Sequence, residues 1–217
     1  MVSARKLAPG LGVGAGLVCA AGLAVEIARF AGRLDPEAWL RTALSLSYEG
    51  NLPTWYSSGL LWTCALGLGL CAEGVEERGE RARWRVLAAL FMLLSLDEAI
   101  ELHELLGGAE LHGVLYFSWV VPGALLTGVF GLSYLGFWLR LPAPTRRGFA
   151  LAFALYVGGA LGMELPLGAW VEVHGDENLG YALLDAVEES LEIVGLSVFL
   201  VAILRHRERE RAPGADR

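Results

Sequence analysis

Long apolar stretches separated by arginine clusters constrain the fold of this chain more than any other feature. Hydrophobic residues make up 55% of the 217 residues, and the mean hydropathy is +0.50. Several stretches approach the roughly 20 residues that a helix needs to cross a bilayer. The sequence therefore predicts an all-α, polytopic membrane bundle that forms a single integral membrane domain over residues 1–217.

Six membrane-spanning helices are expected from the apolar stretches. Their expected ranges, drawn to about three residues, are 10–31, 54–73, 84–106, 114–139, 148–170 and 180–204.

Lysine and arginine predict the orientation of these helices. They gather at the N-terminus, in the loops after the second and fourth spans, and in the C-terminal tail 205–217, while the loops after the third and fifth spans contain none. Positively charged loops tend to stay in the cytoplasm. Both termini are therefore expected on the cytoplasmic side.

The segment 32–53 is expected on the outer surface as a short interfacial helix and loop. Asp35 precedes Pro36 in the order of a helix N-cap and first turn. Apolar residues from Trp39 to Leu44 form one predicted face, with Arg41 on the opposite one. Such a helix either covers a site below it or rests on the lipid headgroups.

Carboxylates in the predicted spans indicate a functional site. The stretches 86–139 and 148–204 contain no lysine or arginine, yet they hold thirteen Asp and Glu residues. Ionised carboxylates cannot stay close together and unpaired in a dry interior. They are therefore expected to hold protons, to line a wet cavity, or to bind cations.

The predicted topology brings these carboxylates to the outer ends of spans three, five and six. On a helix through residue 106, Asp97, Glu101 and Glu104 would share one face. Oxygen ligands at this spacing favour a divalent metal, with Fe, Mn, Ca, Mg and Zn as candidates. The predicted metal ligands are Asp97, Glu101, His103, Glu104, Glu164, Glu189 and Glu192. Further site candidates are Glu49, Asn51, Glu98, Asp185 and Glu188.

A pattern in span three recurs in span six. Leu-Asp-x-x-x-Glu-x-x-Glu-x-x-Gly occurs at 96–107 and at 184–195. Three spans separate the two copies, which would then run in opposite directions, as in inverted three-helix repeats.

Three phrases carry a resemblance to a known family. They are Glu49-Gly-Asn-Leu-Pro-Thr-Trp-Tyr-Ser57, Leu96-Asp-Glu through His103-Glu104, and Glu188-Glu-Ser-Leu-Glu192. The chain resembles a family of uncharacterised bacterial multi-pass membrane proteins with E-x-N-x-P-T-W-[FY]-S, L-D-E…H-E and E-E-x-x-E motifs. The resemblance implies a place in the bacterial cytoplasmic membrane and no particular activity. It favours Glu98 where the helical face favours Glu101, so the choice between these two stays open.

Three functions follow as alternatives. The first is a metal-dependent membrane enzyme that acts on a lipid or another lipophilic substrate, with its catalytic residues unassigned. The second is a cation or proton transporter that uses protonatable carboxylates. The third is a subunit of a larger membrane complex. Membrane lipids are the expected partners, nothing indicates nucleic-acid binding, and a homo-oligomer stays open.

Overall fold

Helices make up all the regular structure of the described chain. The computed structural model describes residues 3–35 and 37–211, except for the side chain of Glu104, and this part contains no strand. The expected all-α class is thus confirmed. The elements are α1 (Ala4–Phe30), α2 (Trp39–Leu44), α3 (Leu52–Glu73), α4 (Arg78–Ile100), η1 (Leu102–Leu106), η2 (Gly113–Leu115), α5 (Val120–Arg140), α6 (Ala143–Val157), η3 (Gly158–Met163), α7 (Glu164–His174) and α8 (Leu179–Glu210).

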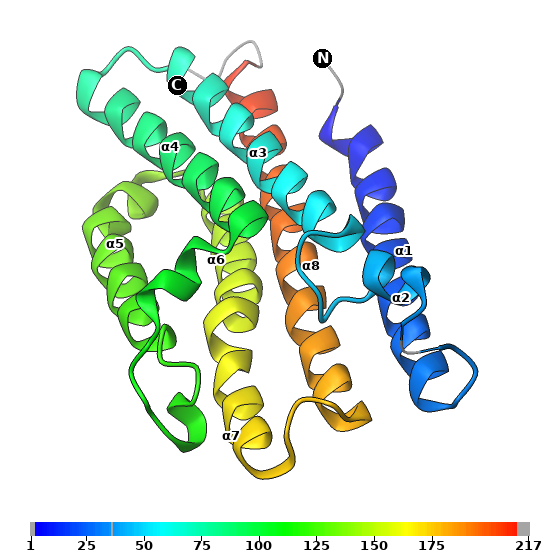
Figure 1. The fold of residues 1–217 in the computed structure, drawn as a ribbon. Coiled ribbons are helices and arrows are strands. Elements are labelled where there is room, and N and C mark those ends of the chain that lie inside the picture. The colour runs from blue at the N-terminus through cyan, green and yellow to red at the C-terminus, as the bar shows by residue number, and fades with distance from the viewer. Residues whose placement is uncertain (1–2, 36, 212–217) are drawn as a thin grey trace.

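The long helix α8 is the centre of the bundle. It packs against α1, α3 and α6, while α3 also pairs with α4 and α5 lies at the periphery (Figure 1). The α3–α4 turn and both ends of the described chain lie at one end of the bundle, and the α7–α8 turn lies at the other (Figure 1). The backbone N–H of Ala4 donates to Oε1 of Glu208 over 2.7 Å, which joins the start of α1 to the end of α8.

Three segments are long and apolar enough to cross a membrane. They are Ala4–Phe30, Val120–Arg140 and the continuous helix Ala143–His174. The helices α3, α4 and α8 have 22, 23 and 32 residues, so they match these in length, and α4 and α8 carry more charged residues.

An aromatic cluster fills the end of the bundle where the chain begins and ends. Trp84 is completely buried, with its ring edge-on to Phe137 at 5.0 Å and to Phe149 at 6.2 Å. The imidazole of His206 stacks on Trp84 at 5.1 Å. Four helices, α4, α5, α6 and α8, therefore meet around one indole ring.

The predicted third span is wrong at its outer end. The helix α4 ends at Ile100 rather than at residue 106, because Glu101 takes a left-handed conformation with φ 56° and ψ 44°. Few residues other than glycine adopt this conformation. Glu101 and Glu104 are therefore not on a helical face with Asp97, which removes one argument for the predicted metal centre.

The predicted fourth span begins too early. The helix α5 starts at Val120 instead of residue 114, and the short turn η2 precedes it as a separate element. The two copies of the proposed repeat also differ, since 184–195 is continuous helix and 96–107 is broken at Glu101.

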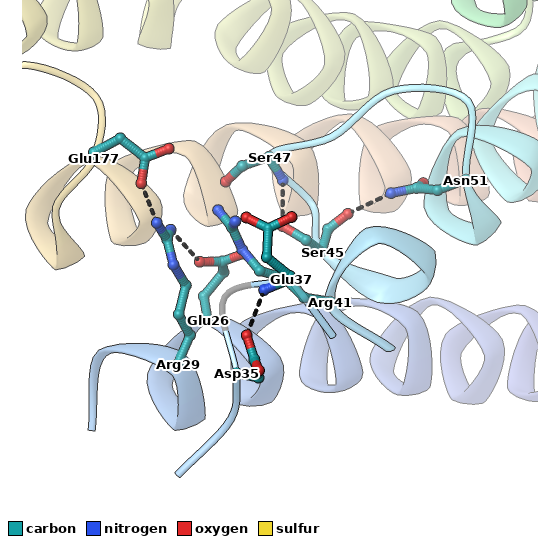
Figure 2. Close-up of polar contacts among 9 residues, drawn as sticks. All are labelled: Glu26, Arg29, Asp35, Glu37, Arg41, Ser45, Ser47, Asn51 and Glu177. Carbon is teal, nitrogen blue, oxygen red and sulfur yellow. Dashed lines mark hydrogen bonds and ion pairs between the residues drawn. The ribbon is translucent and has the colours of Figure 1, made fainter. Parts of the chain in front are cut away.

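The predicted start of the interfacial helix is wrong, and its arginine side faces the bundle. In α2 the side chain of Trp39 is 77% exposed, whereas Arg41 is only 6% exposed and faces the bundle. The helix begins at Trp39, so Asp35 does not cap it, and Oδ1 of Asp35 instead accepts a hydrogen bond from the backbone N–H of Glu37 (Figure 2). The predicted first-turn residue Pro36 lies outside the described residues.

Candidate functional site

Three glutamates from two helices form the centre of the candidate site. Glu98 on α4 lies near Glu189 and Glu192 on α8, close enough for its charge to act on both. Glu189 and Glu192 stand three residues apart, so they share one face of α8. Each of the three keeps part of its surface accessible. We call Glu98, Glu189 and Glu192 the carboxylate cluster.

A tyrosine that was not predicted from the sequence lies at this cluster. Tyr156 on α6 is close enough to interact electrostatically with Glu192, Glu98 and Asp97. No sequence motif identifies it, because an aromatic residue in an apolar helix is normally interpreted as a packing residue. A phenol can donate a hydrogen bond to a carboxylate or pass a proton to one.

Glycines bring α6 close to α8 at this level. A Cβ atom at Gly195 would lie 2.7 Å from the backbone nitrogen of Tyr156. A Cβ atom at Gly159 would lie 2.8 Å from the carbonyl oxygen of Glu188. Gly159 belongs to η3, a π-helical turn inserted between α6 and α7. Such turns often occur at functional sites.

A buried serine on α3 faces the same region. Cys64 is seven residues after Ser57, so both lie on one face of α3, and Sγ of Cys64 lies 3.8 Å from the carbonyl oxygen of Leu196. The helix α8 runs parallel to α3, and Glu189 precedes Leu196 by seven residues on α8, so Ser57 and Glu189 lie at the same level. Ser57 is 2% exposed, and its hydroxyl has no hydrogen-bond partner among the described residues. Ser58, by contrast, bonds to Ser95.

The loop before α3 carries two more predicted residues. Asn51 is structural: its Oδ1 accepts the N–H of Thr54 over 3.2 Å, which caps α3, and its Nδ2 donates to the carbonyl of Ser45 over 2.7 Å (Figure 2 draws the second bond). Glu49 is exposed on one side. Desolvation against the protein, followed by the charge of Glu101, raises the pKa of Glu49, and His103 opposes this shift.

The loop after α4 folds back on Asp97. Oδ1 of Asp97 accepts the backbone N–H of His103 over 2.6 Å and lies 3.3 Å from Nδ1 of the same residue. The imidazole packs against Trp119 at 4.8 Å, and Nε1 of Trp119 donates to Glu164 over 2.9 Å. Asp97, His103 and Glu164 therefore form a polar wall beside the cluster.

Two further acidic residues extend the site along α8. Glu188 is 8% exposed and interacts with the charges of Glu164 and Asp185. Asp185 lies beside the hydroxyl of Ser47 and near the charge of Glu26. The predicted acidic residues of α8 are thus spread over two helical turns and do not surround a single point.

A buried ion pair completes the acidic region, and the sequence analysis did not identify it. Nε of Arg41 on α2 donates to Oε1 of Glu26 on α1 over 3.1 Å, with Glu26 only 2% exposed (Figure 2). Arg29 contacts Glu26 at 3.5 Å and also pairs with Glu177 from the α7–α8 loop (Figure 2). Glu26 is the single charged residue between Lys6 and Arg29, and this isolated position in an apolar stretch could have indicated a buried ion pair.

The described residues do not support the predicted metal centre. No three of their His, Cys, Asp and Glu side chains are grouped so that they could hold a metal ion. The break at Glu101 is one reason, since it separates the expected ligands of span three. The side chain of Glu104, also a predicted ligand, lies outside the described residues.

Comparison with known proteins gives a family and no named relative. No curated protein and no solved structure matches the chain. Residues 11–207, nearly the whole chain, match one family model. The chain therefore belongs to the family described as the domain of unknown function DUF8692.

Proposed function

We propose that this chain is an integral membrane enzyme that uses the carboxylate cluster as acid and base toward a lipid-soluble substrate. The observation that supports it is that the carboxylate cluster and Tyr156 lie close enough to interact electrostatically. The stretches of α4, α6 and α8 that bring them together contain no lysine or arginine. These stretches therefore place no lysine or arginine beside the cluster to balance its negative charge.

The proposal includes six membrane crossings, with α3, α4 and α8 added to the three apolar segments. Arginines in the first turns of α4, around the α5–α6 turn and at the end of α8 favour a cytoplasmic location for this end of the bundle, and with it both termini. Exposed Trp39 and Trp55 would then lie in the outer aromatic belt. The resemblance to bacterial multi-pass proteins favours the bacterial cytoplasmic membrane.

The same orientation gives the depth of the cluster. Glu189 precedes Arg205 by 16 residues on α8, about 24 Å along the axis, and Glu98 follows Arg85 by 13 residues on α4, about 20 Å. The hydrocarbon core is about 30 Å thick. The cluster would therefore lie in the outer third of the membrane, close to where a lipid joins its headgroup to its chains.

Carboxylates at this depth would share protons. Several of them close together in a medium of low dielectric constant cannot all be charged, so some retain a proton at neutral pH. A protonated carboxyl can give its proton to a leaving oxygen while a neighbouring carboxylate takes one from the attacking water. The reaction class that fits is hydrolysis of the polar linkage of a lipid.

A transporter is less well supported than an enzyme. The aromatic rings of Trp84, Phe149 and Phe199 fill the bundle between the cluster and the end where the chain begins. Among the described residues, this packing places apolar rings beside α8 on the way to that end. A divalent metal is not part of the proposal, because no three described ligands are grouped to hold one.

Two measurements on purified protein in liposomes test the proposal. Infrared spectra at neutral pH should contain a protonated-carboxyl band that decreases in Glu98→Gln and Glu192→Gln and persists in Glu110→Gln, an exposed loop control. Mass spectrometry of a bacterial lipid extract should detect a hydrolysed lipid with the wild type and the control only. A spectrum without the band, or equal hydrolysis by Glu192→Gln, would contradict the proposal.

A further inference from the structure

An apolar groove runs between α1 and α8 on the side of α8 away from the carboxylate cluster. Its volume is about 620 Å³. Small and apolar side chains form its walls, among them Gly16, Cys19, Ala20, Leu23, Ala186 and Ser190. Larger apolar residues at its rim, such as Val187, are about half exposed, so the groove opens outward from the bundle.

The groove and the end of α1 match the depth profile of one membrane leaflet. Arg29 follows Arg5 by 24 residues on α1, about 36 Å along the axis. The two arginines are thus spaced like the headgroup layers on either side of a hydrocarbon core of about 30 Å. Cys19 to Leu23 then lie in the outer half of that core, below the level of Arg29.

Arg29 has the chemistry to bind a lipid phosphate. Its guanidinium pairs with Glu26 and with Glu177, and its own side chain is 13% exposed. The side chain of Glu177 is 68% exposed, and exposed ion pairs contribute little to stability. A guanidinium binds phosphate through two parallel hydrogen bonds. A phosphate could therefore replace Glu177 without changing the local charge balance.

From the groove, its depth and Arg29 together we infer that this face holds an anionic phospholipid of the outer leaflet. One acyl chain lies in the groove between α1 and α8, and the phosphate binds Arg29 in place of Glu177. The inference rests on the membrane orientation proposed above. It does not depend on the acid–base role of the carboxylate cluster, which lies on the opposite side of α8.

Cys19 provides a native probe of the groove. It lines the groove and is partly exposed, whereas Cys64 and Cys71 are buried. In detergent-purified full-length protein, phosphatidylglycerol should slow alkylation of Cys19 by N-ethylmaleimide several-fold, as measured by intact mass. Diacylglycerol, which lacks the phosphate, should protect less. Cys19→Ala gives the background rate.

Two charge variants should change the protection of Cys19 by phosphatidylglycerol in opposite directions. Arg29→Gln should remove the advantage of phosphatidylglycerol over diacylglycerol, and Glu177→Gln should strengthen protection because it frees Arg29. A matched control places the probe on another face of α1, as Ala21→Cys in the Cys19→Ala background. Ala21 lines a separate groove of about 270 Å³ beside α2 and α3, and protection there should not respond to Arg29.

Three results would overturn the inference. They are equal alkylation with and without phosphatidylglycerol, protection that is unchanged in both charge variants, and protection that follows protein concentration, which would indicate a second copy in the groove. Glu192→Gln should keep the wild-type protection. Loss of hydrolysis in that variant and loss of lipid binding at Arg29 are therefore separate outcomes.

Discussion

Gly159 lies so close to Glu192 that a Cβ atom at Gly159 would be 2.8 Å from Cγ of Glu192. Only a hydrogen atom at this position lets the π-helical turn η3 approach the carboxylate cluster. We expect Gly159→Ala to destabilise the protein by about 1–3 kcal/mol, as overpacking does. Denaturant unfolding in detergent measures this change. Gly158→Ala is the matched control, because no atom lies within 4 Å of its added carbon, and an equal effect of both variants would contradict the close-approach argument.

The buried ion pair between Arg41 and Glu26 gives a second prediction. Removing Arg41 leaves the buried Glu26 with only the longer contact to Arg29, and breaking a buried ion pair costs up to about 3–5 kcal/mol. We therefore expect Arg41→Gln to lower the thermal unfolding temperature strongly, whereas Arg33→Gln, an exposed arginine near α2, should have little effect. In Arg41→Gln combined with Glu26→Gln, part of the loss should return, since neither charge remains. A double variant less stable than Arg41→Gln would show that the charges are not coupled.

The sequence predicted the all-α fold and the position of most acidic residues along it, because apolar length and arginine placement are properties of the chain itself. It did not predict the end of α4 at Ile100, because neither a glycine nor a proline at this point indicates that Glu101 takes a left-handed conformation. Nor did it predict that α2 turns Arg41 inward, because the partner, Glu26, is 15 residues away on another helix. Burial of that ion pair depends on tertiary packing, which cannot be predicted from the helical face of one segment.

Tyr156 illustrates the same limit at the candidate site. Its place among the charges of Glu192 and Glu98 depends on the close contact of α6 with α8 at Gly159 and Gly195. Helix periodicity cannot distinguish such a residue from one that faces lipid. Glu98 shows the converse case, because motif resemblance favoured it while the helical face favoured Glu101.

Asn51 supports a third prediction, about the loop that carries Glu49. Its side chain caps α3 and also holds the carbonyl of Ser45. Asn51→Ala should cost about 0.5–2 kcal/mol, the usual effect of removing an N-cap. Asn51→Asp keeps the cap and loses the donor to Ser45, so its stability should lie between those of the wild type and Asn51→Ala. Denaturant unfolding of all three proteins checks this order, and an Asp variant as unstable as the Ala variant would assign the effect to Ser45 alone.

His206 gives a prediction about pH, at the opposite end of the bundle and beyond the predicted sixth span. Burial, followed by the charge of Arg209, lowers the pKa of His206 to about 4, against about 6.5 in an unfolded chain. Between these values the unfolded chain binds more protons, so the free energy of unfolding should fall as pH decreases from about 6.5 to 4. The loss for a shift of this size is on the order of 3 kcal/mol. His206→Phe keeps a ring to stack on Trp84 and removes the titrating group, so unfolding curves of this variant should lack that part of the pH dependence. Identical pH profiles for the two proteins would show that His206 does not titrate between the folded and unfolded states.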